Sequence, residues 1–310
     1  MTKMDMNRRD FLKVQLAGAV SAFLAPGLLL TGRAAAQSAP PDLAVVTGSP
    51  GPATRAAVDL LGGIKQFVRP GQRVVIKPNM SFSTPPERAS NTHPEVVREL
   101  VILCQEAGAS SILVVDHTLH RPENCLENSG IRAACNAVVK NCVQAVNDPS
   151  LFSEVKIPQG RRMNSTEVMK AVLQSDVLIA APVAKSHSST GVSLSMKGMM
   201  GLVYDRRTMH FKDIHTCVVD LCTVLKAQLT VIDATRVLST GGPGGPGTVL
   251  PGRMVIASRD MVAADAYTVA QFEWYEQKFR PAQVAHIRQA HERGLGRMDI
   301  ENLKIKKITV

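Results

Sequence analysis

Five short runs of β-branched and apolar residues constrain the fold more than any other feature of the sequence. They lie at 73–79, 110–117, 175–185, 228–234 and 252–260. Most are separated by segments with helical periodicity, such as 94–107 and 213–226. Near-continuous apolar strands that alternate with helices are typical of a parallel sheet covered on both faces. The sequence therefore predicts an α/β fold with a mainly parallel, twisted sheet and helices on both faces.

The domain organisation follows from where this alternation holds. Residues 118–174 are less regular and indicate either loop or a small inserted lobe. No internal repeat interrupts the rest. We expect a single α/β domain over 37–310, with 118–174 as the candidate lobe.

The first 36 residues have the order of an export signal. "NRRDFLK" (7–13) is a twin-arginine motif, followed by an apolar run (14–31) and three alanines (34–36). Gly18, Pro26 and Gly27 break the apolar run, so we expect no permanent membrane span. We therefore assign 1–36 as a signal for the twin-arginine translocation machinery, with a periplasmic mature chain. Because this route carries folded proteins, it favours a bound cofactor.

The charge of the chain limits its partners. The formal net charge is +10, and aromatic residues make up 4% of the sequence. With few aromatic rings to stack on bases and no dense basic run, we expect a small anionic ligand and no nucleic acid. A solvated basic surface explains the same composition.

Six cysteines would enter an oxidising compartment after export. None forms a C-x-x-C pair of the kind that holds zinc or iron–sulfur clusters. Cys125, Cys135 and Cys142 are the best candidates for a disulfide or a cluster.

Polar groups follow each predicted strand, at Lys77-Pro78-Asn79, Asp116-His117, Lys185-Ser186-His187, Asp233 and Asp260. In open parallel sheets, ligands bind beyond the carboxyl ends of the strands. Asp260 precedes a helical segment and is better explained as a helix cap. The loop 239–247 is either a Gly/Pro surface turn or a nest of amides for an anion. We expect the remaining groups to form a binding site.

These motifs resemble the domain-of-unknown-function 362 family over most of the mature chain. The resemblance rests on "VVIKPN", "NTHPEVV", "SDVLIAAPVAKSH", "MKGMMGL", "VIDATRVLSTGGPGG" and "ASRDMVAADA". Some members of that family carry a fused ferredoxin-like domain, which this chain lacks. The resemblance therefore implies an iron–sulfur cluster as an alternative cofactor.

A more distant resemblance concerns the His120-Arg121-Pro122 triplet, which is similar to an element of the nickel-pincer lactate racemases. It implies that His120 and His187 form an acid–base pair, that Lys197 tethers a nickel-bearing organic pincer cofactor, and that His210 ligates the metal. The sequence departs from that pattern at Ser195-Met196, where the racemases have glycines. A simple anion site built from Lys185, Lys197 and loop amides is the alternative.

The chemistry implied is inversion at a carbon next to a carboxylate. It needs a proton acceptor on one face, a donor on the other and cations for the carboxylate. We expect Lys185 to help hold the cofactor, and the substrate to contact Lys77, Asn79, Arg121 and Asp233. The predicted function is an exported, cofactor-dependent enzyme that acts on a small hydroxy-acid-like anion by racemase-type proton or hydride transfer. The alternatives are an iron–sulfur redox protein and a non-catalytic periplasmic anion-binding or accessory protein.

Overall fold

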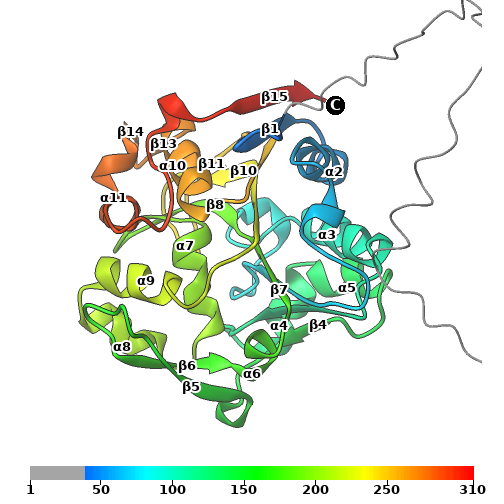
Figure 1. Cartoon of the computed structure of the whole chain (residues 1–310), viewed down its shortest axis with the longest axis horizontal. Coiled ribbons are helices and arrows are strands. Elements are labelled where there is room, and N and C mark those ends of the chain that lie inside the picture. The colour runs from blue at the N-terminus through cyan, green and yellow to red at the C-terminus, as the bar shows by residue number, and fades with distance from the viewer. Residues whose placement is uncertain (1–38) are drawn as a thin grey trace, which may run out of the picture. The chain divides into compact units, whose positions relative to one another are not determined.

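A large central sheet organises the chain. The computed structural model describes residues 39–310, and the export signal predicted at 1–36 lies outside them. The sheet has 11 strands. Its continuous path runs in the order β15 (Ile305–Thr309), β1 (Leu43–Thr47), β12 (Met254–Ser258), β10 (Leu229–Leu238), β7 (Val177–Ala181), β2 (Arg73–Pro78), β3 (Ser111–Asp116) and β4 (Val143–Ala145). Figure 1 labels β15, β1, β10, β7 and β4 of this path.

All strands of this path run in one direction except β12, which is antiparallel to both of its neighbours. The mainly parallel sheet predicted from the apolar runs is thus confirmed. The exception has a simple cause, because a parallel return needs a long crossover, usually a helix. The connection 239–253 between β10 and β12 contains only the short strand β11 (Val249–Leu250), so β12 returns antiparallel.

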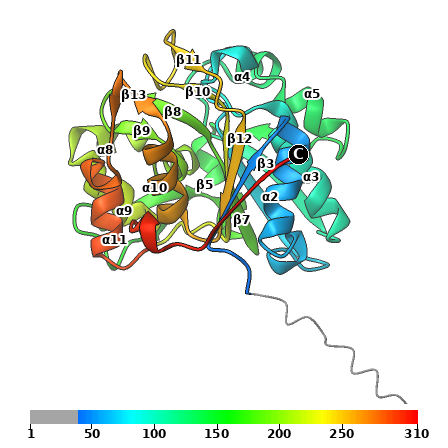
Figure 2. The same ribbon diagram turned by 90° about the horizontal axis from the view of Figure 1, so that it is seen from above.

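Helices cover both faces of the sheet, as Figure 2 shows. One face packs against α2 (Pro50–Leu60), α3 (Pro94–Glu106) and α5 (Ile131–Asn136). The other packs against α7 (Ser195–Gly198), α9 (Ile214–Cys222), α10 (Met261–Gln271) and α11 (Ala285–Glu292). Two apolar cores therefore enclose the sheet, which is why its strands are apolar on both faces. The predicted Asp260 cap is present, since its side chain accepts hydrogen bonds from Val262 N and Ala263 N.

Residues 118–174 contribute both to the main sheet and to a separate one. After α4 (Pro122–Asn128) and α5, β4 joins the main sheet. Then β5 (Phe152–Lys156) and β6 (Ser165–Met169) form their own two-stranded antiparallel sheet, followed by α6 (Lys170–Leu173). A second small sheet joins β13 (Glu273–Trp274) and β14 (Gln277–Lys278).

The strand after β7 sets up the site. β8 (Val183–His187) continues from β7, pairs with the carboxyl half of β10, and turns back through β9 (Gly191–Ser193). The chain then forms α7 and α8 (Arg206–Phe211). Loops after β2, β3 and β8 consequently meet at the carboxyl ends of the parallel strands. None of the helices formed by residues 39–310 is long and apolar enough to cross a bilayer.

Candidate functional site

A cavity of about 480 Å³ lies at the carboxyl ends of the strands. Its wall is built from the loops after β2, β3 and β8 and from α7, α8 and the loop 239–247. Among the lining residues are Lys77, Asn79, Phe82, Asp116, Lys185, His187, Ser193, Lys197, Arg206 and His210. Polar groups that are far apart in the sequence thus line one cavity.

Lys77 and Asp116 form a buried ion pair at the ends of the neighbouring strands β2 and β3. Lys77 Nζ lies 3.1 Å from Asp116 Oδ1, and the two side chains are 2% and 1% exposed. Lys77 also donates to the carbonyl oxygen of Pro78. Burial lowers the pKa of Lys77, whereas the Asp116 charge opposes that shift. A Cβ atom at Gly201 would lie 2.2 Å from Asp116 Oδ1, so only glycine lets the chain pass this close to the pair.

Lys185, on β8, is enclosed on several sides. Its Nζ donates to the carbonyl oxygen of Ser90 at 2.5 Å and lies 4.8 Å from the centre of the Phe82 ring. Burial, together with the positive charges of Lys77 and Lys197, lowers the pKa of Lys185 to about 7. Its amine is therefore partly neutral at neutral pH.

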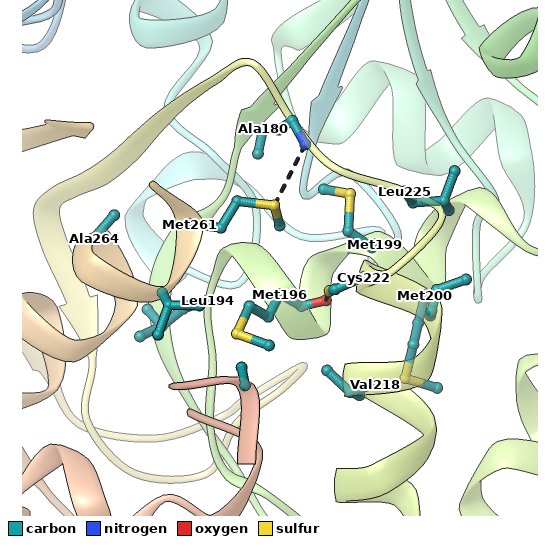
Figure 3. Close-up of a cluster of buried hydrophobic side chains, with 14 of the residues drawn as sticks. Ala180, Leu194, Met196, Met199, Met200, Val218, Cys222, Leu225, Met261 and Ala264 are labelled. Carbon is teal, nitrogen blue, oxygen red and sulfur yellow. Dashed lines mark hydrogen bonds between the residues drawn. The ribbon is translucent and has the colours of Figure 1, made fainter. Parts of the chain in front are cut away.

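Lys197 lies in the short helix α7, which the core holds in place. Asp265 on α10 accepts hydrogen bonds from Ser195 N at 2.8 Å, from Ser195 Oγ at 2.6 Å and from Met196 N at 3.0 Å. Figure 3 shows Met196, Met199 and Met200, which flank Lys197 in the sequence, in a cluster with residues of α9, α10 and the segment after α9: Val218, Cys222, Leu225, Met261 and Ala264. These neighbours anchor the turn and leave Lys197 in the cavity wall.

The Lys197 amine has no hydrogen-bond or ion-pair partner within the part of the chain that the structure describes, although the residue is only 8% exposed. Burial and the positive charges of Arg206 and Lys77 lower its pKa to about 7. Lys197 is therefore the cavity lysine whose amine is free to contact a ligand.

Two histidines contribute to the same wall. His187 at the end of β8 is 5% exposed, and its Nδ1 accepts a hydrogen bond from Ser189 N at 3.1 Å. Its ring stacks on that of His210 with the ring centres 5.9 Å apart. Burial, followed by the charge of Lys197, holds the pKa of His187 far below its usual value. His187 is consequently neutral in the free protein.

Arg206 is a site residue that the sequence analysis missed. It begins α8, donates to the carbonyl oxygens of His117 and Thr118 at 2.7 and 3.1 Å, and lines the cavity. Its position depends on contacts with the β3 loop, which is 88 residues away in sequence. The only feature of the local sequence that could have indicated Arg206 as a site residue is the pair Arg206-Arg207, which lies shortly after the "MKGMMGL" motif.

Three predicted site residues lie outside the cavity wall. His120 is exposed, its Nδ1 accepts from Ser83 N at 3.1 Å, and its ring meets the edge of Phe82 instead of the cavity. Arg121 is exposed and serves as the N-cap residue of α4. Asp233 is fully buried, accepts from His93 N at 2.8 Å and pairs with Arg236 at 2.6 Å. Its carboxylate therefore joins elements together and does not face a ligand. The other six predicted residues do line the cavity: Lys77, Asn79, Lys185, His187, Lys197 and His210.

The loop 239–247 contributes to the site by close packing. Gly242 N donates to Ser186 Oγ at 2.9 Å, and Pro243 lines the cavity. A Cβ at Gly244 would lie 2.7 Å from the Phe82 ring. The loop thus forms part of the cavity wall, and Gly242 N is directed to a protein oxygen instead of an anion.

The cysteines take no part in this site. All six are buried free thiols, and Cys125, Cys135 and Cys142, the candidates for a disulfide or a cluster, form no disulfide in the described chain. Burial is the main cause that raises the pKa of each of these three thiols. Within residues 39–310 no three His, Cys, Asp or Glu side chains are grouped to hold a metal ion.

Comparisons with known proteins identify relatives. The family model described as "Domain of unknown function (DUF362)" matches residues 74–270. The thylakoid-associated protein sll1697 of Synechocystis sp. (strain ATCC 27184 / PCC 6803 / Kazusa) is 27% identical over 227 residues, which are 68% of this chain and 66% of that protein. The chain thus spans just under two thirds of this relative.

Two solved structures are distantly similar. The lactate racemase apoprotein from Thermoanaerobacterium thermosaccharolyticum gives a TM-score of 0.42 at 14% identity, covering 61% of this chain and 49% of that one. A protein from Thermotoga maritima gives 0.41 at 13% identity, covering 60% and 51%. This chain spans about half of each.

Proposed function

This chain belongs to the DUF362 family, and on that premise we propose that its cavity binds a small organic anion on which His187 and Lys197 carry out proton transfer. Family membership specifies no reaction. The proposal therefore rests on the chemistry of the cavity wall.

The single observation that carries the proposal is an excess of buried positive charge. Five cationic groups line a cavity in which Asp116 is the one carboxylate among the lining residues that the structure describes: the buried Lys77, Lys185 and Lys197, the half-buried Arg206 and the exposed Arg207. Uncompensated charge is unfavourable in a buried site. For this reason the pKa values of the three lysines are lowered, which favours their neutral forms. A bound anion supplies the missing negative charge.

Proton transfer is supported by the state of His187. Because Ser189 N donates to its Nδ1, the neutral ring carries its hydrogen on Nε2. A bound anion offsets the surrounding positive charge and raises the pKa of His187 toward the range useful for acid–base chemistry. Lys197, with a pKa of about 7, is the second group that can exchange a proton near neutral pH.

The substrate class we propose is a small hydroxy acid or a related anion, and the cavity of about 480 Å³ is of a size that small ligands occupy. The wall fits part of the pincer-cofactor hypothesis, because Lys197 offers a free amine for a tether and His210 a ring nitrogen for a metal. Such a cofactor would supply a hydride acceptor. The export signal predicted at 1–36 would place the activity in the periplasm.

A second candidate function is anion binding without catalysis. The position of His120 favours it, because that residue lies outside the cavity wall and no His120–His187 pair faces a substrate from two sides. The two functions differ in one measurable property, which is proton exchange on the bound molecule.

Anion binding is tested by calorimetric titration of the purified chain with lactate and with oxalate. We expect Lys185→Met to weaken binding by about 10- to 100-fold, since a hydrogen bond to a charged group contributes roughly 1.5–3 kcal/mol. Lys226→Met removes an exposed lysine and is the control. Equal binding by all three proteins would refute the proposed site.

Catalysis is tested by incubating the protein with lactate in deuterated water and following deuterium at the carbon next to the carboxylate. Exchange that is lost in His187→Gln, with lactate binding retained, supports proton transfer. Binding without any exchange moves the assignment to the non-catalytic candidate.

A further inference from the structure

The three cavity lysines differ in what holds their amines. Lys77 pairs with Asp116 and donates to Pro78, and Lys185 donates to Ser90 at 2.5 Å. Across residues 39–310, nothing accepts a hydrogen bond from Lys197 Nζ or pairs with it, and yet the side chain is 8% exposed and lines the cavity. A nearly buried amine without a partner is available for a bond to a ligand.

The Lys197 amine also has the features of a nucleophile. An amine attacks only in its neutral form, and nucleophilic lysines are made neutral by desolvation or by a neighbouring cation. Both influences act here, since burial and the charges of Arg206 and Lys77 lower the pKa of Lys197 from 10.5 to about 7. The three hydrogen bonds that Asp265 accepts from Ser195 and Met196 fix the turn that carries it.

We propose that Lys197 forms a reversible imine with the carbonyl group of a small 2-oxo acid. The inference rests on the proposed function in one respect, namely that the cavity holds a carboxylate. Lys77 and Arg206, which line the same cavity as Lys197, are the cations for that carboxylate, and its adjacent carbonyl group would share this cavity with the Lys197 amine.

The step balances without any further reactant. The nitrogen lone pair of neutral Lys197 forms a bond to the carbonyl carbon, and the carbonyl oxygen gains a hydrogen from the amine. Loss of this oxygen with the second amine hydrogen releases one water molecule and leaves a C=N bond. His187 can relay these hydrogens, giving one from Nε2 and regaining it, because its ring is neutral and lies close enough for the charge of Lys197 to lower its pKa. No oxidant or reductant is consumed.

The test is reductive trapping of the purified full-length chain with pyruvate and borohydride. Hydride adds to the imine carbon and leaves a stable carboxyethyl group on the nitrogen, which mass spectrometry of the intact chain and of its peptides detects. We expect one group per chain, located at Lys197. Lactate, which has a hydroxyl group in place of the keto group of pyruvate, should give no adduct.

Two variants make the test specific. Lys197→Arg keeps the positive charge but cannot form an imine, so it should give no adduct at position 197. Lys226→Met should be trapped like the unaltered chain. Because the peptide map of the unaltered chain locates the adduct by itself, the test does not depend on the folding of either variant.

Each remaining outcome is decisive. If oxalate and pyruvate bind but no adduct forms at Lys197, the imine is refuted while the proposed anion site stands. If neither anion binds and no adduct forms, both proposals fail. Adducts spread over exposed lysines refute the imine. A purified chain that already carries a mass excess on Lys197, together with nickel in elemental analysis, refutes it in favour of a tethered cofactor.

Discussion

At the scale of single residues, the ion pair between Lys77 and Asp116 stabilises the cavity wall only when both of its members are present. Asp116 Oδ2 also accepts from Met80 N at 3.0 Å and from Ser81 Oγ at 2.9 Å, so this carboxylate joins the loop after β2 to the end of β3. Removal of one member of a buried pair leaves an uncompensated charge, whereas removal of both does not.

We therefore expect Asp116→Ala to lower the free energy of unfolding by about 3–5 kcal/mol, measured by urea denaturation. The double variant Lys77→Met/Asp116→Leu should recover part of this loss because neither charge remains. Glu292→Ala, which breaks an exposed pair with Arg288, should change the stability by less than about 1 kcal/mol. A double variant less stable than Asp116→Ala would show that the charge of Lys77 is not the cause.

The two lysines with a pKa of about 7 make stability depend on pH in a definite direction. In the unfolded chain Lys185 and Lys197 keep their protons up to about pH 10.5, whereas in the folded chain they lose them near pH 7. Above pH 7 the unfolded state therefore binds more protons, and the stability of the free protein should rise with pH. The slope is at most about 1.4 kcal/mol per pH unit for each lysine.

Urea denaturation between pH 7 and 8, below the ordinary thiol pKa of 9.0, measures this slope. The variant Lys185→Met/Lys197→Met should reduce it. Anion binding should show the opposite trend and weaken as the pH rises above 7, since a neutral amine no longer attracts the anion. A slope unchanged in the double variant would assign the effect to other groups.

At the scale of elements, α7 is too short to be stable alone and depends on α10 for its position. Asp265 accepts three hydrogen bonds from the first turn of α7, and burial raises its pKa to about 7. Asp265 is thus a positioning residue for Lys197 and is absent from the residues that line the cavity.

Asp265→Ala should lower the free energy of unfolding by about 1–3 kcal/mol, because buried N–H groups lose their acceptor. It should also weaken oxalate binding by about tenfold, equivalent to roughly 1.4 kcal/mol, through displacement of Lys197. Asp260→Ala is the matched control, since it removes the cap of α10 at a cost of about 1 kcal/mol and should leave the affinity unchanged. Equal losses of affinity in both variants would indicate a general loosening of α10 instead.

The same elements show how far the sequence could predict the molecule. The five strands and the site residues Lys77, Lys185 and Lys197 follow from local patterns, because an apolar run and the polar group after it are adjacent in the chain. Arg206 and Asp265 could not be found in this way, since each acts through contacts with distant segments. The opposite holds for His120. Its local motif predicts a site residue, but in the fold its ring packs against the distant Phe82.

At the scale of the whole molecule, the two ends of the described chain meet at one edge of the sheet, away from the strands that build the site. β1 is buried and pairs with β12 on one side and with β15 on the other. Both β1 and β15 lie outside the residues 74–270 that match the family. The exposed residues Lys306 and Lys307 give the outer strand a charged edge, which discourages pairing with another chain.

We expect deletion of 304–310 to uncover the edge of β1 and cause self-association, while oxalate binding per folded chain persists. No residue of β1 or β15 lines the cavity, so loss of the edge strand should act on assembly and leave the anion site intact. Size-exclusion chromatography with light scattering, combined with calorimetry, measures both properties. Lys306→Thr/Lys307→Thr keeps the strand but removes its charges, and it should cause weaker self-association than the deletion does. If the truncated chain stays monomeric but no longer binds oxalate, the edge strand stabilises the anion site and does not prevent self-association.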